Sequence, residues 1–349
     1  MVAAFVDLPG NRQMNTPHHL LRVGAAALAA TLLSTSAQAC ASCGCTLSSD
    51  WESQGLSTSA GWKLDLRYDY LNQDQLRAST HTISPQAASR IVNANGNQEV
   101  EQYTSNHYYT VGLDYSADAN WGINVQLPYV DRAHATLGTA SDGTMAGAGG
   151  GQYVSHTDSL GDIKIVGRYQ GFLPMHNFGL IFGLKLPTGS HTQTGTSTDP
   201  TAPGPVAIDR GLQPGNGTTE LIAGAYYFDL LDIDWGYFTQ ATVQTALNSR
   251  DGYRPGAGEN VNAGVRYLGF ESFTPQLQLN VRHVAHDTGT NADTISTGGT
   301  LAYLSPGVVV PVGKRTSVYG FAQLPIYQKV SGVQLAPRYT LSFGARFAF

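Results

Sequence analysis

The chain has 349 residues and a formal net charge of −5, and only 13% of its residues are charged, about half the usual share for a soluble globular protein. The negative charge, without a basic run or a phosphate-binding Gly loop, excludes nucleic acid as a partner. Gly is frequent at 40 residues, Tyr occurs 18 times and mean hydropathy is −0.16, a composition typical of a lipid-facing β-barrel rather than of a helical membrane protein.

The amino end predicts a secretory signal peptide over residues 1–39. Arg22 precedes an apolar run at 23–33, and an A-x-A cleavage site follows it. This run is too short to span a membrane as a helix. Met14 is a better start for such a signal than the first Met, and the mature chain is expected to begin at Cys40.

All three Cys of the chain lie in a predicted periplasmic tail, residues 40–60. Cys40, Cys43 and Cys45 combine a C-x-x-C and a C-x-C spacing. These spacings suit a soft metal ion held by thiolates, and they suit equally one disulfide with a spare thiol, or a redox contact with a periplasmic partner. Lipidation of Cys40 is a further alternative. Apart from a metal at this cluster, the sequence predicts no cofactor.

Segments with a side-chain period of two follow the tail. In residues 62–70, five apolar or aromatic side chains alternate with four charged ones, as expected of a strand with two different environments. Twelve such segments are predicted, at residues 62–70, 103–115, 121–129, 160–170, 178–186, 218–228, 233–245, 259–268, 275–283, 299–310, 316–328 and 339–349.

The connections between these segments alternate between long and short. The long ones are residues 72–102, 131–159, 187–217, 247–258, 286–298 and 329–337, and the short ones lie near 117–120, 171–177, 230–232, 269–273 and 311–315. An even strand number with every long loop at one end is typical of outer-membrane barrels. We therefore predict an all-β fold: a transmembrane antiparallel up-and-down β-barrel of about 12 strands over residues 61–349, with helix-free long loops outside the cell and both termini in the periplasm.

Aromatic residues at strand ends are expected to form girdles at the two membrane surfaces. The opposite, polar face of the strands predicts the residues that line the lumen: Lys63, Asp65, Arg67, Asp162, Lys164, Arg168, Lys185, Asp234, Arg266, Arg282 and Arg346. The set is mixed in sign. Opposite charges that pair across a narrow lumen would plug it, whereas unpaired ones would line a conducting path, and the sequence leaves both open.

The last strand ends on an aromatic residue. Its apolar face carries Tyr339, Phe343, Phe347 and the terminal Phe349. This pattern resembles the closing strand of bacterial outer-membrane barrels, in which the terminal Phe is recognised by the barrel assembly machinery. The resemblance implies that machinery, together with outer-membrane lipid, as partners of the chain.

Two short motifs carry a resemblance to a known family. Residues 160–169 read Leu-Gly-Asp-Ile-Lys-Ile-Val-Gly-Arg-Tyr and residues 183–189 read Gly-Leu-Lys-Leu-Pro-Thr-Gly. With the aromatic end, they resemble the outer-membrane transporter family of the MetA pathway of phenol degradation. The resemblance implies a porin-like, non-enzymatic barrel in a Gram-negative outer membrane that passes small, aromatic or weakly acidic solutes.

Two other functions are alternatives to a channel. A structural barrel would use its Cys cluster to bind a metal or a periplasmic redox partner. An outer-membrane hydrolase would need His and Ser two residues apart on a lipid-facing strand, and neither His156 with Ser159 nor the His283–His286 pair has that spacing. The sequence therefore favours passive diffusion through a lumen over catalysis.

Overall fold

The computed structural model describes residues 60–93, 96–97, 100–137, 152–197 and 203–349. The predicted signal peptide, the three Cys and the Gly-rich tract at 145–151 lie outside these residues. Among the residues that the structure describes, no helix is long and apolar enough to span a bilayer.

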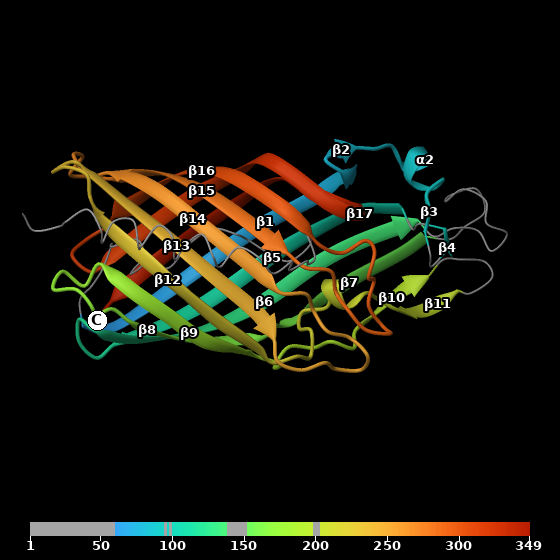
Figure 1. Ribbon diagram of the computed structural model, residues 1–349, viewed down its shortest axis with the longest axis horizontal. Coiled ribbons are helices and arrows are strands. Elements are labelled where there is room, and N and C mark those ends of the chain that lie inside the picture. Colours follow the sequence, from blue (N-terminus) through green and yellow to red (C-terminus); the bar gives the residue numbers. More distant parts are fainter. Residues whose placement is uncertain (1–59, 94–95, 98–99, 138–151, 198–202) are drawn as a thin grey trace, which may run out of the picture. The chain divides into compact units, whose positions relative to one another are not determined.

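The described chain forms a closed antiparallel barrel, as predicted, with 11 strands where about 12 were expected (Figure 1). Its order is β6-β5-β1-β17-β16-β15-β14-β13-β12-β9-β8, and β8 pairs back onto β6 to close the ring. The wall strands are β1 (Gly61–Ser79), β5 (Val100–Ser116), β6 (Trp121–Leu137), β8 (Ile163–Tyr169), β9 (Phe178–Leu186), β12 (Glu220–Leu230), β13 (Trp235–Ala246), β14 (Gly258–Tyr267), β15 (Thr274–Val284), β16 (Gly299–Pro311) and β17 (Thr316–Ala348).

β17 crosses the wall twice. Its first half, residues 317–330, pairs with β16, and its second half, residues 330–348, pairs with β1 in the opposite direction. Gly332 lies between the halves with φ 59°, a conformation that Gly adopts at little cost. The wall therefore has twelve crossings, and the predicted eleventh and twelfth strands are the two halves of one element. The predicted loop at 329–337 is wrong, because these residues continue the strand.

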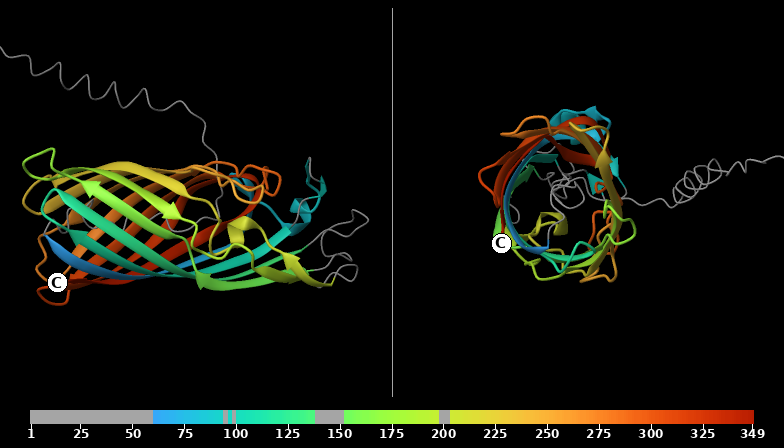
Figure 2. Two further views of the ribbon diagram at one scale, coloured as in Figure 1. Left: turned by 90° about the horizontal axis from the view of Figure 1, so that it is seen from below. Right: turned by 90° about the vertical axis from the view of Figure 1, so that its left-hand side faces the viewer.

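The two ends of the barrel differ. At the short-turn end, where the chain leaves the wall at Ala348, brief turns join the strands, and at the loop end the connections are long (Figures 1 and 2). β1, β5 and β6 are 17 to 19 residues long, whereas β8 has 7 and β9 has 9. The wall is consequently tall along β1, β5 and β6 and low along β8 and β9.

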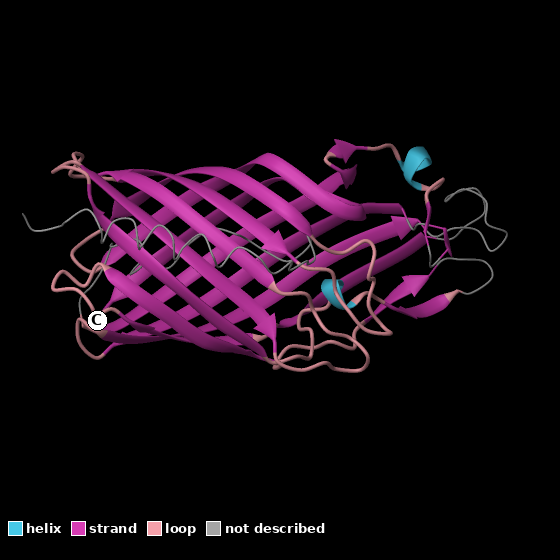
Figure 3. Cartoon of the chain, viewed as in Figure 1, coloured by secondary structure: helices cyan, strands magenta, loops and turns pink. Residues whose placement is uncertain are grey.

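The long connections contain short elements that the sequence did not predict. β7 (Gln152–Leu160) pairs with the loop-end half of β6, and it carries β10 (Thr194–Ser197) and β11 (Gly204–Ala207) beside it. The prediction of helix-free loops is wrong at α2 (Pro85–Ala88) and at the 3-10 turn η1 (Arg210–Leu212), shown in cyan in Figure 3. The remaining short strands are β2 (His81–Thr82), β3 (Val92–Asn93) and β4 (Gly96–Asn97).

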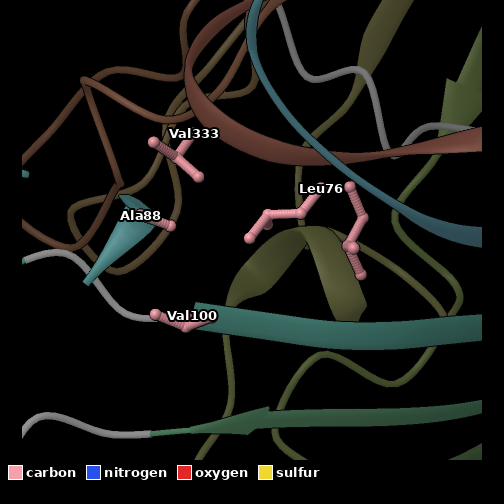
Figure 4. Packing of buried hydrophobic residues seen from close by; sticks show 5 residues of the cluster. Leu76, Ala88, Val100 and Val333 are labelled. Atoms are coloured by element: carbon pink, nitrogen blue, oxygen red, sulfur yellow. The ribbon is translucent and has the colours of Figure 1, made fainter. Parts of the chain in front are cut away.

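α2 forms because Ser84 accepts a hydrogen bond from the Ala87 amide at 3.2 Å and Pro85 occupies the first helical position. A small apolar cluster holds it against the loop ends of three wall strands (Figure 4). The cluster consists of Leu76, Ala88, Val100, Val333 and Leu335, each at most 6% exposed. Burial of one such aliphatic side chain contributes about 1.5–3 kcal/mol, so this cluster stabilises the loop end of the tall side of the wall.

The outer surface of the wall is apolar. Its exposed side chains include Leu66, Val111, Leu113, Ile123, Phe182, Leu184, Val243, Val261, Leu277, Leu279 and Leu324. Trp62, Trp121 and Trp235 each lie at the start of a strand, within its first two residues, at the short-turn end. They pack against Tyr115, Tyr169 and Tyr267. An exposed apolar belt of this extent with an aromatic ring at its edge is the surface that lipid covers.

Candidate functional site

Nine of the eleven charged residues expected in the lumen lie within wall strands and are buried or half-buried. They are Lys63, Asp65, Arg67, Lys164, Arg168, Lys185, Arg266, Arg282 and Arg346. Asp162 and Asp234 lie outside the strands, each one residue before a strand begins, at Ile163 and at Trp235. Asp162 is buried and bonded to Lys185 at 3.0 Å, whereas Asp234 lies in the turn between β12 and β13, where the predicted strand began two residues too early.

Polar side chains near the short-turn end are bonded to one another. Arg168 reaches across from β8 to Asp114 on β5, with Nη1–Oδ2 and Nη2–Oδ1 distances of 2.5 and 2.9 Å, and it donates a third bond to Ser116 at 2.6 Å. Tyr226 donates to the Gln170 side chain at 2.5 Å. We call this region, which lies between the short turns and the middle of the barrel, the turn-end half of the lumen.

Large inward side chains in the turn-end half lie over glycines of the neighbouring strand. Phe238 is directly opposite Gly264, and a methyl group on Gly264 would overlap its ring. The same relation joins Tyr226 to Gly179, Phe321 to Gly307, Arg168 to Gly122 and Arg266 to Gly236. Because a glycine leaves room against the wall, each large group lies along the wall instead of pointing at the barrel axis. This arrangement gives the high Gly content a structural role.

A connection from the loop end folds into the lumen. The carbonyl of Gly211 accepts a hydrogen bond from Nη1 of Arg132 on β6 at 2.7 Å, and the carbonyl of Leu212 accepts one from Thr157 on β7 at 3.2 Å. The Asn216 amide donates to Asp162 at 3.1 Å. The end-on view of Figure 2 shows this yellow segment inside the ring of strands. Residues 210–216 thus form an inward loop that narrows the lumen.

A latch at the rim holds the inward loop. Arg210 donates to Asp251 at 2.8 Å, and His191 lies 3.6 Å from the same carboxylate. The hydrogen bond from Arg210 holds the pKa of Asp251 below its ordinary value. Nearby, the buried Asp287 accepts from Tyr253 at 2.9 Å and from the Gly256 amide at 3.0 Å. Burial raises the pKa of Asp287.

Below the inward loop lies a cavity of about 270 Å³, here called the chamber. Its walls come from β1, β5, β6, β8, β9, β13 and β15, and its roof from residues 210–216 with Tyr253 and Pro255. Six cationic side chains line it, namely Arg67, Arg132, Lys164, Lys185, Arg210 and Arg282, against two carboxylates, Asp69 and Asp162. The chamber is therefore strongly basic, although the whole chain is acidic.

Three of the six cations are paired with carboxylates. Arg67 contacts Asp69 at 2.8 Å. Lys185 contacts Asp162 at 3.0 Å and Glu220 at 2.5 Å, and Arg210 belongs to the latch. In these pairs each carboxylate is bonded to particular cations. The sequence alone counted the same carboxylates against all the basic residues together.

The other three cations have no carboxylate partner within the described chain. Arg132 is bonded to neutral oxygens of Asn106, Gly211 and Tyr108, at 2.5 to 2.7 Å. Arg282 donates to Asn260 at 3.2 Å. Lys164 faces the charges of Lys185, Arg282 and Arg67, and the acidic group near it, Glu220, is already bonded to Lys185. Positive charge is thus concentrated at the chamber.

Sequence reasoning missed Arg132 and Arg210, because it placed both in mobile loops. Arg132 had a usable signal. The inward alternation of Asn124, Gln126 and Pro128 continues through Val130 to Arg132, so extending that strand would have placed its side chain in the lumen. Arg210 had no such signal, since its position depends on how the inward loop folds back.

His156 and His283, two of the histidines that the sequence offered to a hydrolase, make polar contacts with neighbouring strands. His156 contacts Asp131 at 2.8 Å, and both side chains are exposed. Nδ1 of His283 lies 2.8 Å from the Thr300 hydroxyl on the next strand. Across the described ranges, no group of three or more His, Cys, Asp and Glu side chains is placed to hold a metal ion.

Solved structures with a similar fold are outer-membrane proteins. An outer membrane channel from Pseudomonas putida F1 matches with a TM-score of 0.56 at 10% identity, over 83% of this chain and 96% of that one. The CymD monoaromatic hydrocarbon channel matches with a TM-score of 0.47 at 11% identity, over 90% and 95%. The β domain of the Bordetella autotransporter BrkA matches with a TM-score of 0.44 at 15% identity, over 83% and 100%.

No family model matches the sequence, and no curated protein matches it either. The likeness to the Pseudomonas putida channel therefore establishes the fold: this chain is an outer-membrane type of β-barrel. The barrel that was expected from the resemblance to phenol-pathway transporters is confirmed.

Proposed function

We propose that the protein is a passive outer-membrane channel for small solutes, with a preference for aromatic or weakly acidic ones. The observation that carries the proposal is the basic chamber inside a closed, lipid-facing wall. A positive electrostatic potential, focused between walls of low dielectric constant, raises the local concentration of negatively charged solutes. The fold shared with a Pseudomonas putida outer membrane channel supports it, and the resemblance to phenol-pathway transporters supports an aromatic solute.

The proposal includes an orientation. The loop end faces the outside and the short-turn end, with the carboxyl terminus, faces the periplasm, since outer-membrane barrels have short periplasmic turns. Export depends on the signal peptide at 1–39. An epitope inserted at Thr196 should be accessible to antibody on intact cells, and one at Gly171 should not be. The reverse labelling would refute this orientation.

Assembly is proposed to depend on the aromatic end. Phe343 is exposed on the outer wall, as is the terminal Phe349, while Tyr339 contacts Tyr70 of the paired strand. Tyr339, Phe343, Phe347 and Phe349 are then available to the barrel assembly machinery. Deletion of Phe349 should lower the heat-modifiable folded fraction, and an unchanged fraction would argue against the signal.

Transport is tested with proteoliposomes. Liposomes that contain the protein should swell in a small aromatic acid faster than empty ones, and in a planar bilayer the protein should conduct with a slight anion preference. Arg282→Glu should shift selectivity toward cations, while Arg315→Glu, which makes the same charge change at an exposed short turn, should shift it less. Liposomes that stay tight would favour the structural barrel, in which the tail carries the function.

A further inference from the structure

We propose that Lys164 and Arg282, with Arg132 toward the loop end, form a binding site in the chamber for the carboxylate of a small aromatic acid. The inference rests on the proposed channel function and adds to it a defined, saturable station on the path. It treats the chamber as a site built for one class of anion, and not only as a region of positive potential.

Three cations in the chamber favour a bound anion. Lys164, Arg282 and Arg132 face one chamber without a carboxylate partner among the described residues. Like charges that face a common space repel one another, and the repulsion is strongest where walls exclude bulk water. A bound anion removes that repulsion, so the arrangement is more favourable with an anion present.

One of these cations also has an unsatisfied hydrogen-bond donor. Nε of Arg282 is buried and has no hydrogen-bond partner within the part of the chain that the structure describes. A buried N–H without an acceptor is unfavourable and calls for a partner. A carboxylate suits this position, because guanidinium presents paired donors that match two carboxylate oxygens. Lys164 supplies a compact charge beside it.

Part of the chamber lining is apolar. Pro128 and Val130 of β6 lie in the chamber beside Tyr108, and Pro214 and Pro255 contribute to its roof. These groups give nothing to a fully hydrated ion such as phosphate, but they pack against a flat ring. The cavity of about 270 Å³ lies just under the usual range of small-molecule sites, about 300–1,000 Å³. A single aromatic ring with one carboxylate is the class of solute that fits both the charge and the size.

Equilibrium dialysis of the purified full-length protein in detergent tests the site with benzoate as the probe. Benzamide, the neutral analogue of the same shape, and inorganic phosphate serve as comparison probes. We expect saturable benzoate binding that benzamide and phosphate at equal concentration do not displace. Loss of one charge-assisted bond lowers affinity about tenfold, so Lys164→Gln and Arg282→Gln should each weaken binding by about that factor.

Two further variants control the interpretation. Arg315→Gln removes the same charge at an exposed turn outside the chamber, so it should bind benzoate as the unchanged protein does. Lys164→Arg keeps the charge and should restore most of the affinity, which separates lost binding from a damaged fold. Heat-modifiable mobility reports folding of each variant.

Several outcomes overturn the site. Equal binding of benzoate and benzamide would show that the carboxylate is not recognised, and displacement by phosphate would show a general anion site. Unchanged affinity in Lys164→Gln and Arg282→Gln would place binding elsewhere. Parallel conductance measurements keep the two proposals apart: absence of benzoate binding in a conducting protein refutes the site alone, and benzoate binding in a protein that does not conduct refutes the channel alone.

Discussion

The turn-end half of the lumen and the chamber are lined by the same residue types, but they use them differently. In the turn-end half, Arg168 is held by Asp114 and Ser116 through three hydrogen bonds. In the chamber, Lys164 and Arg282 have no carboxylate partner among the described residues. The number of charges in a lumen therefore says little about its field. What matters is which charges are paired. Pairing divides this lumen into a part that stabilises the barrel and a part whose cations have no carboxylate partner among the described residues.

Space is distributed differently along the lumen as well. Paired polar groups near the short turns lie along the wall because glycines receive them, and the chamber holds a cavity of about 270 Å³. Conduction through the lumen is the proposal that planar-bilayer recordings test.

The largest expected effect is loss of the Arg168–Asp114 pair. Asp114→Ala leaves the Arg168 guanidinium, which is 5% exposed, without its carboxylate. Removing one partner of a buried pair costs about 3–5 kcal/mol, and remaining lumen water should bring the loss toward the lower figure. Urea unfolding of the folded barrel in detergent measures it.

The matched change in the chamber is Lys164→Ala, which removes a charge that has no carboxylate partner. Its free energy of unfolding should fall by less than about 1 kcal/mol, or rise, because like-charge repulsion is relieved. If Asp114→Ala and Lys164→Ala destabilise the barrel equally, the division of the lumen by pairing is wrong.

A smaller effect is expected from filling one of the glycine positions. Gly264→Val should push the Phe238 ring away from the wall and toward the axis, because their side chains would overlap. Overpacking of this kind costs about 1–3 kcal/mol, and single-channel conductance should fall. Gly313→Val, at a turn where an added Cβ meets nothing within 4 Å, is the control. Unchanged conductance in folded Gly264→Val would show that Phe238 does not border the path.

Sequence periodicity predicted part of every wall strand, although it ended β1 and β6 too early and took residues 329–337 for a loop. Residues 178–186 coincide with β9, and 299–310 with all but one residue of β16. Alternation with a period of two is a local property that lipid on one side and lumen on the other impose directly. The same periodicity placed Arg168 and Lys185 on the lumen face, because a residue's face follows from its position within the strand.

Pairing within the lumen could not be predicted in the same way. Arg168 and Asp114 are 54 residues apart, and they meet only because β8 closes the ring onto β6. The inward loop was missed for a related reason. Its carbonyls at Gly211 and Leu212 are bonded to wall residues 79 and 55 positions away, and no local pattern of Gly, Pro and Thr specifies those partners.

The smallest expected effect concerns the latch over the chamber. Arg210→Gln removes the bond to Asp251, and the inward loop at residues 210–216 should then be held less firmly inside the lumen. Because Arg210 is at the rim and Asp251 is half-exposed, the barrel itself should unfold as before. Single-channel recordings should show a higher mean conductance or more frequent transitions. Arg250→Gln is the control, since Arg250 is exposed and lies farther from Asp251, at 3.5 Å.

Acid should reproduce the effect of Arg210→Gln within a defined range of pH. The pKa of Asp251 is lowered from its ordinary value of 3.8 by the bond from Arg210, so the latch is fully present above that value and is lost as the pH falls through the lowered pKa. His191 lies 3.6 Å from the same carboxylate. Conductance should therefore rise only as the pH falls below the ordinary Asp251 value, where the bond from Arg210 is lost. Asp287, whose pKa is raised by burial, contacts Tyr253 and Gly256 rather than Arg210, so its protonation at higher pH should not open the latch. Asp251→Asn should abolish the rise in acid, and a rise that persists in this variant would assign it to another group.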